Sequence, residues 1–173
     1  MNYEISTVTD DDKDSLAELR IFAMKESLEN IGRFDPDRAR SRFLEKFLSE
    51  DTRKVLLNGE LIGFYVLKNK GDHFYLDHLY FAPKFQSAGV GGSVLSSIKE
   101  QAKASNLPIR LGALKNSRSN NFYKKTGFAI RTKKSGISIM SSRIANQRVK
   151  CDACTSRALR GVMRKKGNAD ERT

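Results

Sequence analysis

The stretch FAPKFQSAGVGG, residues 81–92, joins a strand-like run to a helix-like run and so restricts the possible folds. The run HFYLDHLYFAP at 73–83 is rich in β-forming residues and ends at Pro83. The run after the glycines repeats apolar residues at helical spacing. Because glycine destabilises a helix, its use at the start of one indicates that something approaches the backbone closely there.

This junction has the composition of an anion site. Backbone N–H groups at a glycine-rich turn and the positive end of the following helix both attract phosphate. The stretch is not a Walker A loop, because no Gly-Lys-Ser/Thr follows it. It is also not the GxGxxG of a dinucleotide fold, which occupies the first strand–helix turn of its domain. We therefore expect a phosphorylated ligand to bind at residues 86–92.

The rest of the chain alternates between strand and helix patterns. Asn58-Gly59, between two β-rich runs, predicts a type I′ hairpin, and Asp35 with Pro36 predicts a capped helix start. Strands are expected at 3–8, twice within 53–69, and at 73–83, 109–114, 128–132 and 137–142. Helices are expected from the cap at 10–15 to Gly32, from Asp35 to Phe47, around 94–102, and over 117–125. The predicted order is β-α-α-β-β-β-α-β-α-β-β, an α/β (α+β) fold.

Length and composition favour one globular domain. A chain of 173 residues with 39% hydrophobic and 30% charged residues is long enough for one real core. No apolar run approaches the roughly 20 residues needed to span a bilayer. The acidic start MNYEISTVTDDDKDSLAEL lacks the apolar region of a signal peptide, so a cytoplasmic location and no membrane partner are expected.

The net charge of +12 is concentrated near the end of the chain. Residues 131–173 contain 12 lysines and arginines against 3 acidic residues, whereas residues 1–130 contain 20 against 17. A nucleic-acid-associated protein that binds through this basic tail is therefore one hypothesis. The alternative is a solvated extension, disordered or weakly helical, over 144–173. The tail residues in question are Arg157, Arg160, Arg164, Lys165 and Lys166.

The cysteines do not predict a metal site. Cys151 and Cys154 form a lone CxxC pair, while structural zinc needs about four ligands. The chain has two histidines, His73 and His78, which are an odd number of residues apart in an expected strand. Regular alternation would point them to opposite faces, so no metal is expected.

Two motifs together resemble the GNAT superfamily of N-acetyltransferases. LYFAPKFQSAGVGG is similar to the acetyl-CoA signature of that family, a strand and proline followed by Gln/Arg-x-x-Gly-x-Gly/Ala, with Gln86, Gly89 and Gly91 at the defining positions. The segment NSRSNNFYKKTGF at 116–128 is similar to Asn-x-x-Ala-x-x-Phe-Tyr-x-x-x-Gly-Phe. Its matching residues are Asn116, Phe122, Tyr123, Gly127 and Phe128. The element order also agrees, and the resemblance covers about residues 1–143.

The resemblance implies a mixed, mostly antiparallel central sheet flanked by helices. It implies an acetyl-CoA-dependent N-acetyltransferase that acts on a primary amine by direct attack through a tetrahedral intermediate, without a metal. The acceptor would be a small molecule or a peptide, and a homodimer is possible. A domain that binds coenzyme A without catalysis stays open as an alternative. The acceptor is expected between the early helices and the hairpin, near Met24, Arg33, Phe34 and Tyr65.

The resemblance also assigns residues to the cofactor. The N–H groups of Val90, Gly91 and Gly92 would hold the pyrophosphate, and residues 86–89 would complete the cradle: Gln86, Ser87, Ala88 and Gly89. The pantetheine arm would pair with the backbone of Leu79, Tyr80 and Phe81, which requires this strand to splay from its neighbour, an effect of a bulge in family members. Asn116 and Ser119 would also face the cofactor, although the family has alanine at the position of Ser119.

Tyr123 is the candidate general acid. A phenol with a pKa near 10 is protonated at neutral pH and can donate to a departing thiolate. The alternative is a packed aromatic before a helix end.

Asp77 and His78 are the candidate bases, because family members that use a side chain as the base often place it on the strand before the signature, at the position that Asp77 occupies here. Alternation would place Asp77 with Leu79 and Phe81, and His78 with Tyr80 on the other face, so both could serve one site only if a bulge intervened. His78 has the better intrinsic pKa, whereas Asp77 would act through water or attract a cationic amine. The alternative for either is a hydrogen-bonded strand residue.

Overall fold

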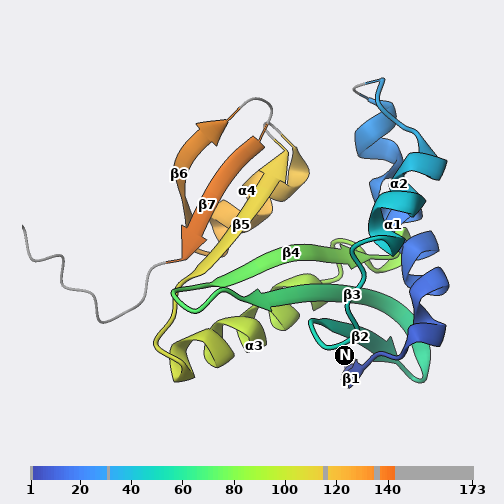
Figure 1. Ribbon diagram of the computed structural model, residues 1–173. Coiled ribbons are helices and arrows are strands. Elements are labelled where there is room, and N and C mark those ends of the chain that lie inside the picture. Colours follow the sequence, from blue (N-terminus) through green and yellow to red (C-terminus); the bar gives the residue numbers. More distant parts are fainter. Residues whose placement is uncertain (1, 31, 115–116, 135–136, 143–173) are drawn as a thin grey trace, which may run out of the picture.

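The computed structural model describes residues 2–30, 32–114, 117–134 and 137–142 (Figure 1). Its strands are β1 (Glu4–Thr7), β2 (Thr52–Leu57), β3 (Glu60–Asn69), β4 (Phe74–Phe81), β5 (Ile109–Leu114), β6 (Phe128–Lys134) and β7 (Ile137–Ser142). Its helices are α1 (Lys13–Glu29), α2 (Pro36–Leu44), α3 (Val90–Ala104) and α4 (Arg118–Lys125), with 3-10 turns at Asp10–Asp12 and Pro83–Phe85. The predicted order of elements is confirmed.

The strands form one seven-stranded sheet in the order β1-β2-β3-β4-β5-β7-β6. Every neighbouring pair is antiparallel except β4 and β5, which run parallel. The predicted fold class, a mixed and mostly antiparallel sheet flanked by helices, is confirmed. None of the helices in the described ranges is long and apolar enough to cross a membrane.

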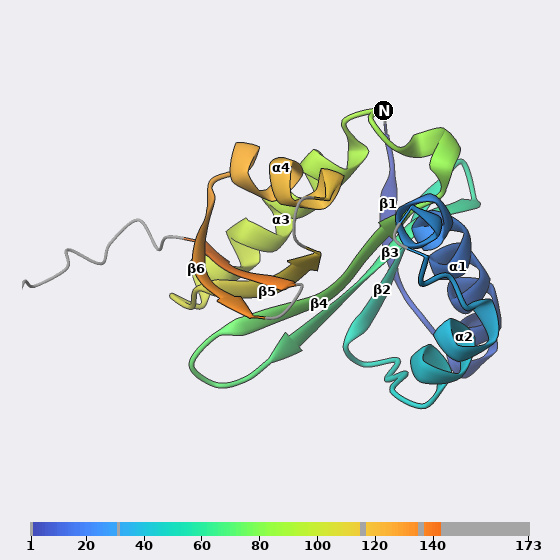
Figure 2. The ribbon, with the colours of Figure 1, turned by 90° about the horizontal axis from the view of Figure 1, so that it is seen from above.

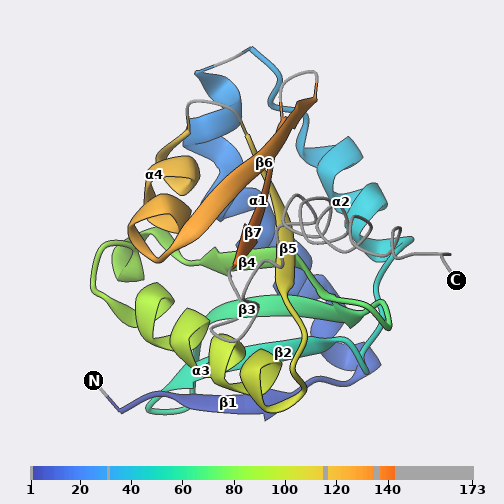
Figure 3. The ribbon, with the colours of Figure 1, turned by 90° about the vertical axis from the view of Figure 1, so that its left-hand side faces the viewer.

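The helices cover both faces of this sheet. Figure 2 shows α1 and α2 on one side of β2–β4 and α3 and α4 on the other, and Figure 3 shows α3 in front of the sheet with α1 behind it. Each face has its own core. Leu16, Ala17, Leu19 and Phe43 from α1 and α2 pack on Phe64 and Val66 of β3. The larger core joins α3, α4 and the sheet around Val94, Leu95, Ile98, Leu111, Tyr123 and Met140.

Local signals explain where the early elements begin. The carboxylate of Asp35 accepts a hydrogen bond from the N–H of Arg38 at 3.0 Å, and Pro36 begins α2, as predicted. Asn58 and Gly59 have φ values of 52° and 80°, the pair of left-handed residues that a type I′ turn requires. The hairpin of β2 and β3 is thus fixed by its turn.

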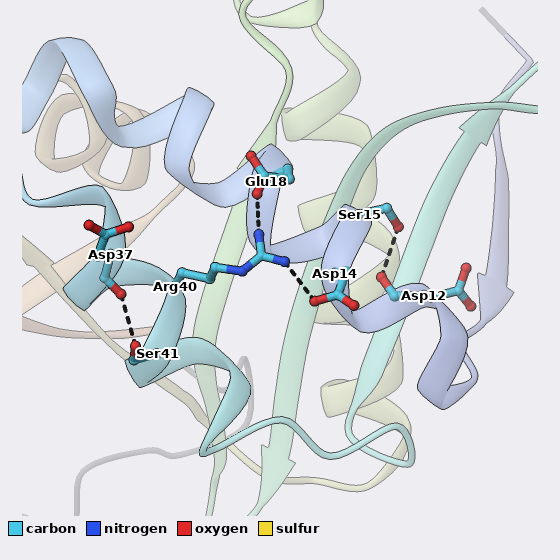
Figure 4. Close-up of polar contacts among 7 residues, drawn as sticks. All are labelled: Asp12, Asp14, Ser15, Glu18, Asp37, Arg40 and Ser41. Carbon is cyan, nitrogen blue, oxygen red and sulfur yellow. Dashed lines mark hydrogen bonds and ion pairs between the residues drawn. The ribbon is translucent and has the colours of Figure 1, made fainter.

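Salt bridges join the two early helices on their outer surface. Arg40 of α2 lies between two carboxylates of α1, with its Nη2 at 2.8 Å from Asp14 and its Nη1 paired with Glu18 (Figure 4). Arg20 of α1 donates from Nη1 to the carbonyl of Ala39 at 2.8 Å. The arginine-rich α2 is therefore held against α1 by charge as well as by Phe43.

Candidate functional site

The parallel strands β4 and β5 separate halfway along β4. They pair at Phe74–Ile109, Tyr75–Arg110 and Leu76–Leu111. Beyond that point β4 continues along β3 to Phe81, while β5 continues along β7 to Leu114, and Figure 1 shows the two strands diverging. Within the part of the chain that the structure describes, residues 77–81 therefore have no strand partner on the β5 side. This is the splay that an extended, amide-rich ligand would need.

A β-bulge lies where this separation begins. In the register of β3 with β4, Val66 faces His78 and the next residue, Leu67, faces Leu76. Asp77 is thus an extra residue in β4. An extra residue breaks the alternation of side chains and increases the local twist, which helps β4 to turn away from β5.

The bulge places Asp77 and His78 on the same face of the sheet. Asp77 accepts a hydrogen bond from Nζ of Lys68 at 2.8 Å, and Lys68 shares its face with Val66 by alternation along β3. His78 pairs with Val66 across the strands. The prediction that Asp77 points with Leu79 and Phe81 is therefore wrong, because those two face the α3 side, whereas the grouping of His78 with Tyr80 is right.

His78 lies in an aromatic setting. Its ring centroid is 5.7 Å from that of Phe43, 6.2 Å from Phe64 and 5.6 Å from Tyr80. Burial lowers the pKa of His78 to about 4, although the Asp77 carboxylate partly opposes this. Its Nδ1 is buried and has no hydrogen-bond partner among the described residues. His78 is therefore a neutral and weakly basic imidazole at neutral pH.

Asp77 is ionised but already paired. Burial alone would raise the pKa of Asp77, but the hydrogen bond from Lys68, with His78 and Lys46 nearby, holds this pKa below its usual value. The carboxylate is thus a weak base whose charge is offset by Lys68. Neither of the two candidate bases has the pKa of an efficient proton acceptor near pH 7.

We expect the free energy of unfolding to fall as the pH drops from 7.5 to 5, because folded His78 resists protonation. An unfolded histidine has a pKa near 6.5 and the folded one has a pKa of about 4, so below pH 6.5 the unfolded state binds more protons. The stabilisation is complete above pH 6.5 and is lost progressively towards pH 4. The loss by pH 5 should be roughly 2 kcal/mol, measured by urea unfolding at both pH values.

The substitution His78→Phe should remove most of this pH dependence, and His73→Gln is the matched control that should keep it. An unchanged slope in His78→Phe would mean that the pH dependence does not originate at His78.

Tyr123 lies on the other side of the separated strands. Its ring centroid is 5.2 Å from that of Phe122 and 5.7 Å from that of Phe128. Burial raises the pKa of Tyr123, and the phenol of Tyr80 adds to the rise, so the hydroxyl stays protonated at neutral pH. Tyr80 packs with Phe64 on the α1 side of the sheet, whereas Tyr123 belongs to the core on the α3 side.

The glycine-rich loop forms an open helix start. The side chain of Gln86 donates from Nε2 to the carbonyl of Phe81 at 3.0 Å and so ties the loop to the end of β4. Ser87 and Gly89 have φ values of 66° and 82°. A Cβ added at Gly89 or Gly92 would meet nothing within 4 Å, so the loop surface is unobstructed there.

The first N–H groups of α3 are suited to an anion. Val90 and Gly91 are its first two residues, so the helix itself offers their N–H groups no carbonyl as a hydrogen-bond partner. The N–H groups of Gly92 and Ser93 both donate to the carbonyl of Gly89, at 3.1 and 3.2 Å. The N–H groups of Val90 and Gly91 are thus the ones available to an anion. The N–H of Gly92, also predicted to bind the pyrophosphate, already donates to Gly89.

Three other predicted positions differ in outcome. Asn116 lies outside the described residues. Ser119 lies in α4, with its hydroxyl 2.7 Å from that of Ser117. Tyr65 is buried in the core on the α3 side, so the expectation that it lines the acceptor region beside α1 is wrong. The reason is its position in β3: Tyr65 lies opposite Leu79 of β4, and both side chains point to the α3 face of the sheet.

Sequence reasoning missed Arg20. Its guanidinium carbon lies 5.9 Å from the ring centroid of Tyr80, and its charge lowers the pKa of His78 further. The available signal was its spacing, because Arg20 follows Leu16 by four residues and so shares the apolar face of α1.

No cluster of three His, Cys, Asp or Glu side chains able to hold a metal occurs in the described ranges. His73 is engaged by Asp72, with 2.6 Å between Nδ1 and the carboxylate. Cys151, Cys154 and the rest of the tail at 144–173 lie outside the described residues.

A model of the acetyltransferase (GNAT) family matches residues 16–128. The fold is similar to that of the PaiA N-acetyltransferase from Thermoplasma acidophilum in complex with coenzyme A, with a TM-score of 0.70, 21% identity, and coverage of 83% of this chain and 99% of that one. It is also similar to PH1933 from Pyrococcus horikoshii, with a TM-score of 0.67, 21% identity, and coverage of 82% and 98%.

A third similar structure is the ribosomal-protein-S18-alanine N-acetyltransferase from Escherichia coli, with a TM-score of 0.58, 18% identity, and coverage of 83% and 94%. A search of curated protein sequences returned no match. At these identities the structural similarity concerns the fold.

Proposed function

The chain belongs to the GNAT acetyltransferase family, and on that premise we propose that it transfers the acetyl group of acetyl-CoA to a primary amine. The observation that carries this proposal is the continuity of two features. The separated half of β4 leads through the loop at 82–89 to the open start of α3, so the unpaired strand backbone is followed along the chain by the first helical N–H groups. The coenzyme A found with the Thermoplasma acidophilum protein of similar fold supports this proposal.

The residues that would hold the cofactor follow from this surface. The N–H groups of Val90 and Gly91 would bind the pyrophosphate at the positive end of α3, with the loop at 86–89 around it. The backbone of Leu79, Tyr80 and Phe81 would pair with the pantetheine amides as an added strand would. The thioester supplies an activated acyl group beside Tyr80 and Tyr123.

The proposed reaction forms one bond and breaks another. The amine nitrogen attacks the thioester carbon, the N–C bond forms and the C–S bond breaks, and the amine loses one proton. Tyr123, whose hydroxyl stays protonated, donates a proton to the departing thiolate and regains one from solvent, which takes up the proton of the amine. Because His78 and Asp77 are both weak bases, we assign the removal of the amine proton to solvent, with Asp77 and Lys68 orienting the acceptor.

The first test is ligand-induced stabilisation of the purified protein. Acetyl-CoA at a hundred times its dissociation constant should add about 2.7 kcal/mol to the free energy of unfolding and raise the Tm by several degrees. ATP and NAD are the controls and should shift the Tm less. Release of free thiol on addition of primary amines then tests transfer.

Two negative results have different meanings. No shift with acetyl-CoA in a folded protein would reject the cofactor assignment. A shift without thiol release on any amine would favour a domain that binds coenzyme A without catalysis.

A further inference from the structure

Arg20 presents an incompletely bonded guanidinium at the face that carries His78. Its Nη1 donates to the carbonyl of Ala39, and its planar group lies over Tyr80 at 5.9 Å from the ring centroid. Its Nε is buried and has no hydrogen-bond partner among the described residues. Leaving a buried donor unpaired is unfavourable, and more so for a charged group, so this atom is expected to find an acceptor in a ligand.

The geometry of arginine specifies which acceptor fits. The Nε–H and one Nη2–H point the same way, and this edge matches the two oxygens of a carboxylate. The bond from Nη1 to Ala39 fixes the orientation of the guanidinium plane, and the buried, unpaired Nε is on the opposite edge. The guanidinium lies over the ring of Tyr80, and burial raises the pKa of the Tyr80 hydroxyl, while the charge of Arg20 and a hydrogen bond from Arg20 offset part of that rise.

The surrounding charge favours the same class of ligand. Lys68 from β3 and Lys46, which follows α2, lie near Asp77, and the carboxylate of Asp77 is bound by Lys68. A second positive group on the acceptor, in addition to its amine, would therefore be repelled at this face, whereas a negative group would be attracted.

The carboxylates of α1 do not reverse this balance. Asp14 and Glu18 are paired with Arg40 on the outer surface (Figure 4). Glu26 is paired with Arg118, with 3.7 Å between the charged atoms.

We propose that the acceptor is a primary amine that also carries a carboxylate, and that Arg20 binds this carboxylate and determines specificity. The inference rests on the proposed acetyl transfer and names the class of its acceptor. Lys46 and Lys68 would add to the preference at longer range. They would also lower the pKa of a bound ammonium, which helps its loss of a proton to solvent.

Three amines of equal chain length test the proposal: 5-aminopentanoate, pentylamine and 1,5-diaminopentane. We expect kcat/KM to be at least about tenfold higher for 5-aminopentanoate than for pentylamine, and lowest for the diamine. In Arg20→Gln the ratio between the first two should fall to near one. Lys103→Gln, the same loss of charge at an exposed site on α3 across the sheet, should leave the ratio unchanged.

A second variant and a second readout keep the test decisive. Lys46→Gln changes an exposed residue and so should not disturb folding, and it should lower the ratio by a factor of about two to three. The affinities of the three N-acetylated products for the protein saturated with coenzyme A should follow the same order as the amines.

Equal product affinities, or a preference for the diamine, would overturn the carboxylate assignment while leaving acetyl transfer in place. No transfer to any of the three amines would count against the proposed function, and the product affinities would still decide the preference.

Discussion

Tyr123→Phe should lower kcat for acetyl transfer by about 100- to 1,000-fold, which corresponds to roughly 3–4 kcal/mol of transition-state stabilisation. The variant removes the oxygen that would protonate the departing thiolate. It keeps the ring that packs against Phe122 and Phe128, so the fold around α4 should be retained. The binding surface for the cofactor lies on β4 and α3, so the stabilisation by acetyl-CoA should also be retained.

The measurement is thiol release at saturating acetyl-CoA and amine, accompanied by the Tm with and without acetyl-CoA. Tyr65→Phe is the matched control, because Tyr65 is also a buried phenol whose pKa is raised by burial, but it lies in the core between the sheet and α3. Its kcat should stay close to that of the parent protein. A kcat for Tyr123→Phe within threefold of the parent value would reduce Tyr123 to a packed aromatic residue.

Short-range signals made much of this fold predictable. The turn at Asn58-Gly59, the cap at Asp35 and the helix start at Gly89 each depend on the backbone preferences of a few neighbouring residues. Such preferences are legible in a single sequence because they need no knowledge of distant partners. The glycine-rich loop, and with it the cofactor region, could be located for the same reason.

The acceptor side could not be predicted in the same way. Regular alternation is the default expectation for a strand such as HFYLDHLYF, and the extra residue Asp77 appears only when its pairing with β3 is known. A shift of one residue reverses the face of every side chain that follows, so an error there moves a candidate base to the other side of the sheet. Tyr65 and Arg20 depend equally on distant packing, one against α3 and the other against Tyr80.

Gly92→Glu should abolish measurable binding of acetyl-CoA, raising Kd by at least about 100-fold, because it puts a carboxylate where the pyrophosphate would lie. A Cβ at Gly92 meets nothing within 4 Å, so the substitution causes no clash in the free protein. An acidic residue in the first turn of a helix is favourable to the helix, by about 0.3–1 kcal/mol. The variant should therefore be at least as stable as the parent protein without ligand.

The opposite signs of these two effects separate binding from folding. The measurement is the Tm of Gly92→Glu with and without acetyl-CoA, together with a direct titration of the cofactor. Ser96→Glu is the matched control, since it adds the same charge at an exposed position one turn further along α3, beyond the first N–H groups. Ser96→Glu should weaken binding by less than about tenfold, because its carboxylate is farther from the phosphates and more fully solvated. A Gly92→Glu protein that still binds acetyl-CoA with the parent affinity would show that the pyrophosphate does not rest on the start of α3, and the cofactor assignment would fail at its central contact.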